Sequence, residues 1–161
     1  MAGGGNPDGK AGIGRMDRGV RVGVDVGAVR VGVALSDPDG ILATPYATVP
    51  RDEANASDLT EISRIVREAD AIEIVVGLPV TLAGTEGPAA VAARAYADRL
   101  AALIAPVPVR LSDERMSTVA ATRRLAERGV RGRRQRAVVD QAAAVEILQG
   151  WLDSQRRRRT L

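Results

Sequence analysis

Residues 20–35 read VRVGVDVGAVRVGVAL, and this alternation decides the first part of the fold. In an extended chain the valines of the first half lie on one face, and Asp25 lies on the other. We therefore expect strands over 20–26 and 29–35. The short Gly-Ala link between them predicts an antiparallel hairpin, which carries a carboxylate opposite its apolar face.

The rest of the chain alternates between strand and helix patterns. We expect a third strand near 41–48, a helix over 55–69, a buried strand over 72–77, a helix from Pro88 to Ile104, a strand over 106–112, a helix from Ser117 to about Arg128, and a last helix over about 136–152. The order β-β-β-α-β-α-β-α-α predicts an α/β fold. Its sheet is mixed, with three antiparallel strands followed by two further strands, and helices cover both faces.

Chain length limits the number of domains, because 161 residues bury a single sizeable core. We expect a disordered Gly-rich segment over 1–18, one domain over 19–153, and a disordered basic tail over 154–161. The sequence has no apolar run of the roughly 18 residues needed to span a membrane, and no secretory signal. Without cysteine there is no sign of an oxidising compartment, so a cytoplasmic location is the default expectation.

Two absent residue types limit the chemistry. The chain has no histidine and no cysteine, which excludes a Ser-His-Asp relay, a thiol nucleophile and the usual zinc sites. Acidic residues remain at Asp25, at Asp113–Glu114 and at Asp140. Carboxylates that converge on one point favour hard cations such as Mg²⁺ or Mn²⁺.

Charge is unevenly distributed along the chain. Residues 1–109 carry 10 basic and 14 acidic side chains, whereas residues 110–161 carry 13 basic and 6 acidic ones, and all 13 cations are arginine. Arginine is suited to bidentate phosphate contacts, so we expect a polyanionic partner, although solvated faces and a free tail would give the same composition. With no Phe, two Tyr and one Trp, the protein should contact backbone more than unpaired bases.

Asp140 is unusual because it falls within the apolar stripe of the last predicted helix. At about 100° per residue it lies among Ala143, Ala144, Ile147 and Leu148. A carboxylate on such a stripe needs a metal, an ion pair or a cap-like hydrogen bond. Small residues on the Asp25 face of the hairpin, at Gly23, Gly32 and Ala34, would let this helix approach closely enough for the two carboxylates to share a cation.

Four blocks resemble one known family: GVDVGAVRVGVALSD, IVVGLPVTLAGTEGP, LSDERMST and VDQAAAVEILQGWLD. They are similar, in order and spacing over about 20–153, to the YqgF (RuvX) family of nucleases with a ribonuclease-H-like fold, related to Holliday junction resolvases. The resemblance implies metal-dependent phosphodiester hydrolysis, in 5′-end maturation of pre-16S rRNA or in cutting branched DNA. It also implies that Asp25, Glu114 and Asp140 are the catalytic acids and the ligands of Mg²⁺ or Mn²⁺.

In such a site Asp25 would bridge two ions held by Glu114 and Asp140, and the ions would activate water and stabilise the leaving oxygen. Neighbours on a strand point to opposite faces, so only one of Asp113 and Glu114 reaches the ions; the family pattern favours Glu114.

Several further residues are candidates for binding nucleic acid. Arg30 and Arg115 could contact phosphate, or could form structural ion pairs, Arg115 with Asp113 among others. Ser117 and Thr118 either cap a helix or bind phosphate at its N-terminus. The remaining candidates lie in the basic connector, at Arg131, Arg133 and Arg134.

Two other functions agree with parts of the sequence. Actin-like kinases share the DxG hairpin, but they close two such domains around a nucleotide, for which this chain is too short. A catalytically inactive nucleic-acid-binding module of the same fold is the main alternative, and the intact acids argue against it. A symmetric junction-cutting enzyme would be a homodimer, although no interface can be recognised in the sequence.

Overall fold

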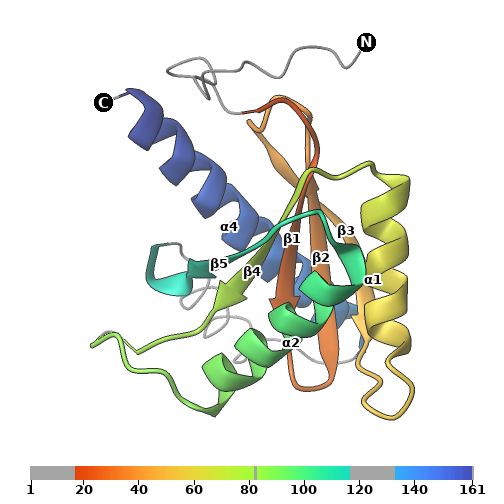
Figure 1. The fold of residues 1–161 in the computed structure, drawn as a ribbon. Coiled ribbons are helices and arrows are strands. Elements are labelled where there is room, and N and C mark those ends of the chain that lie inside the picture. The colour runs from red at the N-terminus through yellow and green to blue at the C-terminus, as the bar shows by residue number, and fades with distance from the viewer. Residues whose placement is uncertain (1–16, 82, 117–132, 161) are drawn as a thin grey trace.

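The computed structural model describes residues 17–81, 83–116 and 133–160, which form a five-stranded sheet with helices on both faces (Figure 1). The strands are β1 (Arg21–Val26), β2 (Arg30–Ser36), β3 (Ala43–Pro50), β4 (Glu73–Leu78) and β5 (Val109–Asp113). Their order across the sheet is β3-β2-β1-β4-β5. The first three are antiparallel neighbours, and β4 and β5 add in parallel, which confirms the predicted mixed sheet.

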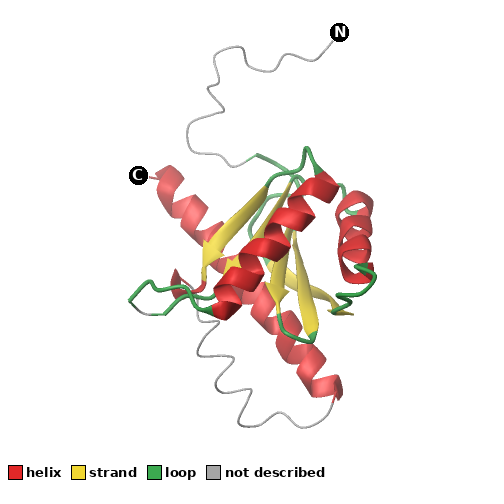
Figure 2. Cartoon of the chain, turned by 60° about the horizontal axis from the view of Figure 1, so that its bottom comes forward, coloured by secondary structure: helices red, strands yellow, loops and turns green. Residues whose placement is uncertain are grey.

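In the described part of the chain, three α-helices cover this sheet. Helices α1 (Ser57–Glu68) and α2 (Pro88–Ile104) pack on one face, and α4 (Arg133–Thr160) crosses the other (Figures 1 and 2). Parallel strands need such crossover connections, and the helices between β3, β4 and β5 supply them. The helical arrangement on both faces also agrees with the sequence prediction.

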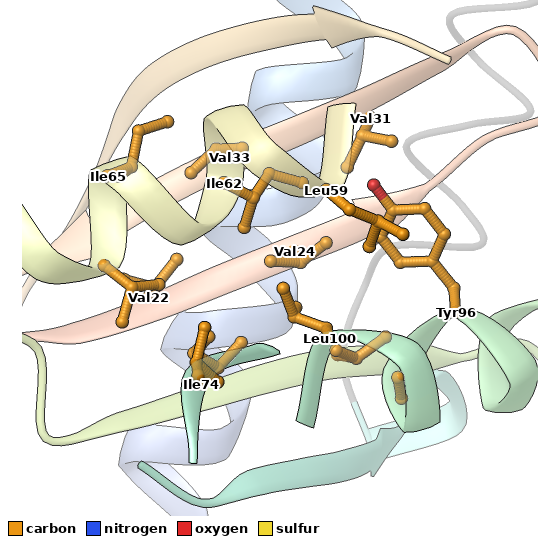
Figure 3. Packing of buried hydrophobic residues seen from close by; sticks show 14 of the residues in the cluster. Val22, Val24, Val31, Val33, Leu59, Ile62, Ile65, Ile74, Tyr96 and Leu100 are labelled. Carbon is orange, nitrogen blue, oxygen red and sulfur yellow. The ribbon is translucent and has the colours of Figure 1, made fainter. Parts of the chain in front are cut away.

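The larger core lies between the sheet and the first two helices. Val22 and Val24 of β1 point into it and meet Leu59 of α1 and Leu100 of α2 (Figure 3). The valines that alternate along the hairpin are therefore the residues that bind the helices to the sheet. Burying one such side chain contributes roughly 1.5–3 kcal/mol.

The opposite face of the sheet is built from small residues. A Cβ atom on Gly23 would lie 2.6 Å from Leu148 Cβ, and one on Gly32 would overlap the carbonyl oxygen of Asp140. Buried Ala143 and Ala144 supply the matching small surface on α4. The close approach predicted for the helix and the Asp25 face is confirmed.

The tail prediction was wrong, because α4 continues to Thr160 and includes most of 154–161. Arginine is a good helix former, and cations near a helix C-terminus interact favourably with its dipole. Arg156 also anchors this part of the helix: its Nη1 donates to the carbonyl oxygen of Gly40 at 2.5 Å, and its Nη2 pairs with Asp153. The helix expected over Ser117–Arg128, and residues 1–16 of the predicted disordered segment, lie outside the described residues. None of the helices in the described ranges is both long and apolar enough to cross a membrane.

Candidate active site

Four residues on adjacent strands form a row across the α4 face of the sheet. Asp25 of β1 is the register partner of Gly32 on β2. Val24 pairs with Val76, so Gly77 of β4 follows beside Asp25, and Gly77 in turn pairs with Ser112 of β5. Asp25 is the only carboxylate in this row, and it lies between two glycines.

The flanking glycines are covered by the other two predicted acids. Asp140 lies over Gly32, where its main chain occupies the space of a side chain. On the other side, a Cβ on Gly77 would lie 3.1 Å from Glu114 Oε1. Asp25 therefore lies between the strand covered by the Glu114 carboxylate and the strand covered by the Asp140 main chain. The fold thus gathers three acids that are far apart in sequence.

Glu114 owes its direction to the end of β5. The strand ends at Asp113, and the chain then turns into a short 3₁₀ helix, η1 (Glu114–Met116). Glu114 is 6% exposed. Burial, together with the negative charge of Asp113, raises the pKa of its carboxyl to about 7. Burial therefore makes the negative charge of this carboxylate costly, and a cation bound beside it would offset that cost.

Asp113 has a different environment from its neighbour. Arg115 Nη2 lies 2.6 Å from Asp113 Oδ2, and the Arg115 main-chain N–H also donates to this carboxylate at 2.9 Å. The Arg115 hydrogen bonds hold the pKa of Asp113 below its ordinary value. Of the two neighbouring acids, Glu114 is the one that lies over Gly77, while Asp113 forms the ion pair that the sequence left open for Arg115.

Asp140 pairs with Arg30 of the hairpin. Arg30 Nε donates to Asp140 Oδ2 at 2.7 Å, and the two side chains are 27% and 20% exposed. The ion pair that the sequence left open for Asp140 is therefore present, with Arg30 as its partner. Within residues 17–81, 83–116 and 133–160, no three acidic side chains are close enough to hold one metal ion in this conformation.

The chain is similar to proteins of one known family. The model of the RuvX family, described as Holliday junction resolvase, matches residues 19–154. The chain belongs to the RuvX family. A relative from Rhodococcus erythropolis, "Putative pre-16S rRNA nuclease", is 56% identical over 154 residues, which cover 94% of this chain and 86% of that one. One of the same name from Nocardia farcinica is 59% identical over 141 residues, covering 84% of this chain and 78% of that one.

A solved structure matches the fold of this RuvX-family chain. It is Thermus thermophilus RuvC in complex with a Holliday junction substrate, with a TM-score of 0.56, 13% identity, and coverage of 88% of this chain and 97% of that one. This similarity confirms the ribonuclease-H-like fold class predicted from the sequence.

The remaining predicted binding residues of the RuvX-family chain are only partly described. Arg115 lies beside the loop after β4, because a Cβ on Gly84 would be 3.3 Å from its Nη1. Ser117, Thr118 and Arg131 lie outside the described residues. Arg133 and Arg134 open α4, and the structure describes their backbone but not their side chains. The loop that follows β4 therefore borders the Asp113–Arg115 pair.

One supporting group was missed by sequence reasoning. Arg51 follows β3, and its Nη1 donates to the carbonyl oxygen of Gly27 at 3.0 Å, in the hairpin that carries Asp25. Its guanidinium lies 5.0 Å from the centre of the Tyr96 ring. The Tyr96 hydroxyl donates to buried Asp58 at 3.0 Å, and burial followed by the Asp58 charge raises the pKa of that phenol. No local sequence signal indicated Arg51, because its partners are brought together only by the fold.

Proposed function

We propose that this protein is a divalent-metal-dependent nuclease that hydrolyses phosphodiester bonds in structured nucleic acid in the cytoplasm. The observation that carries the proposal is the row in which Asp25 lies between Gly77 and Gly32, which Glu114 and the Asp140 main chain cover on the α4 face of the sheet. Family membership supports the nuclease activity. The metal requirement is our inference from the acids.

The acids have the donor chemistry that Mg²⁺ or Mn²⁺ prefers. Carboxylate oxygens are hard ligands, and Asp25 and Glu114 are 4% and 6% exposed. Burial disfavours the charged form of Glu114, so a nearby cation would restore its ionisation. The same cation would draw Asp140 away from Arg30. A metal therefore fits these residues, provided that this ion pair opens when the metal binds.

Bound at these acids, divalent ions would activate a water and stabilise the leaving oxygen. The chain's own residues then have separate tasks. Asp25, Glu114 and Asp140 hold the ions, and Arg30, once released from Asp140, offers its guanidinium to a phosphate oxygen. Arg115 is oriented by Asp113 at the other end of the row, where it can contact a neighbouring phosphate.

Two substrates share the required chemistry. The relatives from Rhodococcus and Nocardia bear the name of a pre-16S rRNA nuclease, and the family is described as Holliday junction resolvase. High identity to the named relatives favours precursor 16S rRNA as the first candidate. Symmetric cutting of a four-way junction would require a homodimer, whereas trimming an RNA end would not.

The test is cleavage by the purified protein of both substrates in parallel, with Mg²⁺, with Mn²⁺ and with EDTA. Asp25→Asn should abolish cleavage and leave nucleic-acid binding largely intact, because it removes a metal ligand rather than a phosphate contact. Asp98→Asn is the matched control, since it neutralises an exposed acid of α2 on the other face of the sheet, and it should keep its activity. Cleavage in EDTA, or by Asp25→Asn, would refute the metal site. Binding without cleavage under every condition would instead favour the inactive module.

A further inference from the structure

A polar cavity lies on the α4 face, at the opposite end of the strands from Asp25 and Glu114. Its volume is about 410 Å³, and its lining includes the first residues of β1 and β4, Arg21 and Glu73, together with Arg110 of β5 and Trp151 and Gln155 of α4. The acids lie near the C-terminal ends of the same strands, so the cavity is distinct from the candidate active site.

The floor of this cavity is a buried charge network. Glu73 accepts from Arg21 Nε and from Arg110 Nε, each at 3.1 Å. Arg21 uses its other two nitrogens on the carbonyl oxygens of Gly19 and Asp17. Arg21 and Glu73 side chains are 4% and 12% exposed, so they neutralise each other and form a fixed support.

Three side chains around this support have hydrogen-bond donors that are not used. Arg110 is 57% exposed and bonds only through Nε, so within the described part of the chain its two terminal nitrogens have no acceptor. The Trp151 indole N–H and the Gln155 side-chain amide also make no hydrogen bond within the described residues. The Arg21 guanidinium lies over the face of the Trp151 ring, 6.0 Å from its centre. Glu73 thus orients Arg110 and leaves the two terminal nitrogens of the Arg110 guanidinium available to a ligand.

Most of these spare groups are donors, and Arg110 adds a positive charge. An oxyanion with several acceptor oxygens satisfies such a set better than a neutral ligand does, and a phosphate is the natural match for an open guanidinium edge. Asp17 also lines the cavity, and its carboxylate would repel an anion beside it. The phosphate must therefore sit on the Arg110 side of the cavity.

Its position relative to the acids suggests where that phosphate comes from. Arg110 and Glu114 are four residues apart along β5 and its end, a distance of about 13 Å for an extended strand. β5 is an edge strand, so a nucleic-acid strand could follow it without displacing a neighbour. Building on the proposed nuclease function, we propose that this cavity binds a backbone phosphate of the substrate strand, a few nucleotides from the bond that is cut.

Trp151 allows a direct test because it is the chain's single tryptophan. In EDTA, titration of the wild type with a single-stranded oligoribonucleotide should change the tryptophan fluorescence saturably, and parallel titrations should use a nucleoside monophosphate and inorganic phosphate. Arg110→Gln should weaken oligonucleotide binding roughly tenfold, the loss expected for one charge-assisted contact. It should also lower the log-log salt slope by roughly 0.7.

Arg64→Gln is the matched control. Arg64 is 45% exposed and, like Arg110, pairs with glutamate, but it lies on α1 across the sheet. It should change neither affinity nor salt slope. Arg110→Lys, which keeps the charge, should recover part of the affinity, and thermal melts of each variant check that it is folded.

Several results would overturn the inference. One is a Trp151 fluorescence that stays unchanged while a labelled oligonucleotide binds to saturation. Another is an equal loss of oligonucleotide affinity in Arg110→Gln and Arg64→Gln. A third is a nucleoside monophosphate that binds as tightly as the oligonucleotide, which would indicate a site for free nucleotides. Asp25→Asn should retain the fluorescence change. A wild type that shows this change but cuts nothing would refute the nuclease proposal alone.

Discussion

Arg30 Nε donates to Asp140 Oδ2 at 2.7 Å, which joins the hairpin to a helix 110 residues later in the sequence. The guanidinium occupies one side of a carboxylate that we assign to the metal. Both side chains are partly exposed, at 27% and 20%, so the pair itself contributes no more than about 1 kcal/mol. A cation that binds Asp140 therefore has to offset only about 1 kcal/mol to open this ion pair.

The first prediction concerns this pair. In EDTA, Asp140→Asn and Arg30→Gln should each change the free energy of unfolding by about 1 kcal/mol or less, because the pair is partly exposed. Mn²⁺ at a hundredfold excess over Kd should stabilise the wild type by about 2.7 kcal/mol, and Asp140→Asn should lose most of that gain. Arg30→Gln should keep it. Thermal melts with EDTA and with Mn²⁺ measure all three proteins.

The opposite pattern would identify a purely structural pair. Asp140→Asn would then lose roughly 3–5 kcal/mol even in EDTA, as expected when a buried arginine is left without its partner. Mn²⁺ would have no effect on either protein.

The second prediction concerns pH. Burial raises the pKa of Glu114 to about 7 in the folded protein, from 4.5 for an unperturbed glutamate. Between these values the folded state binds more protons than the unfolded state, so metal-free stability should fall as pH rises from about 4.5 to 7. The contribution of this group amounts to about 3 kcal/mol by pH 7.

Glu114→Gln should remove that slope. Denaturant unfolding in EDTA at several pH values, with wild type and variant compared at each, isolates the contribution of this residue. Equal pH profiles for the two proteins would show that Glu114 does not titrate in this range.

The third prediction concerns helix docking. Gly32→Ala should destabilise the protein by about 1–3 kcal/mol or shift α4, because the new Cβ would overlap the Asp140 carbonyl oxygen. Cleavage should fall as well, since Asp140 would move with the helix. Gly87→Ala is the control, as a Cβ there meets no atom within 4 Å. Urea unfolding should show a clear loss for the first variant and a change within about 0.5 kcal/mol for the second.

The fourth prediction distinguishes the roles of two arginines near the end of α4. Arg156 bonds the Gly40 carbonyl oxygen, so Arg156→Gln should lower the melting temperature. Arg158 is exposed, and Arg158→Gln should leave the melting temperature unchanged. If the basic end of α4 contacts substrate, Arg158→Gln should reduce the log-log salt slope of nucleic-acid binding by roughly 0.7–0.9. An unchanged slope would make this end a solvated surface.

The hairpin and the helix stripe could be predicted because both are local patterns. Alternation at residues 20–35 indicated which face of β1 carries Asp25, and the small residues at Gly23 and Gly32 indicated how closely α4 would pack. Alternation placed Asp113 and Glu114 on opposite faces but did not decide which of them faces α4, because that depends on the register that sets Ser112 beside Gly77. The resemblance to the family supplied what alternation lacked.

Contacts between distant segments were the other limit. An ion pair at Asp140 was only one of several alternatives, and neither its partner Arg30 nor the bond from Arg51 to Gly27 was anticipated. The tail was misjudged because a run of arginines is typical both of free ends and of helix C-termini. Its helical state depends on Asp153 and on the Gly40 carbonyl, one local partner and one distant.

The three proposed metal ligands lie on different elements, Asp25 on β1, Glu114 after β5 and Asp140 on α4. Asp140 reaches its place only when α4 has docked over Gly32. A chain in which α4 has not docked therefore presents Asp25 and Glu114 without their third partner. If the protein cuts RNA as proposed, docking of α4 and completion of the site are one event, and a partly folded chain is inactive.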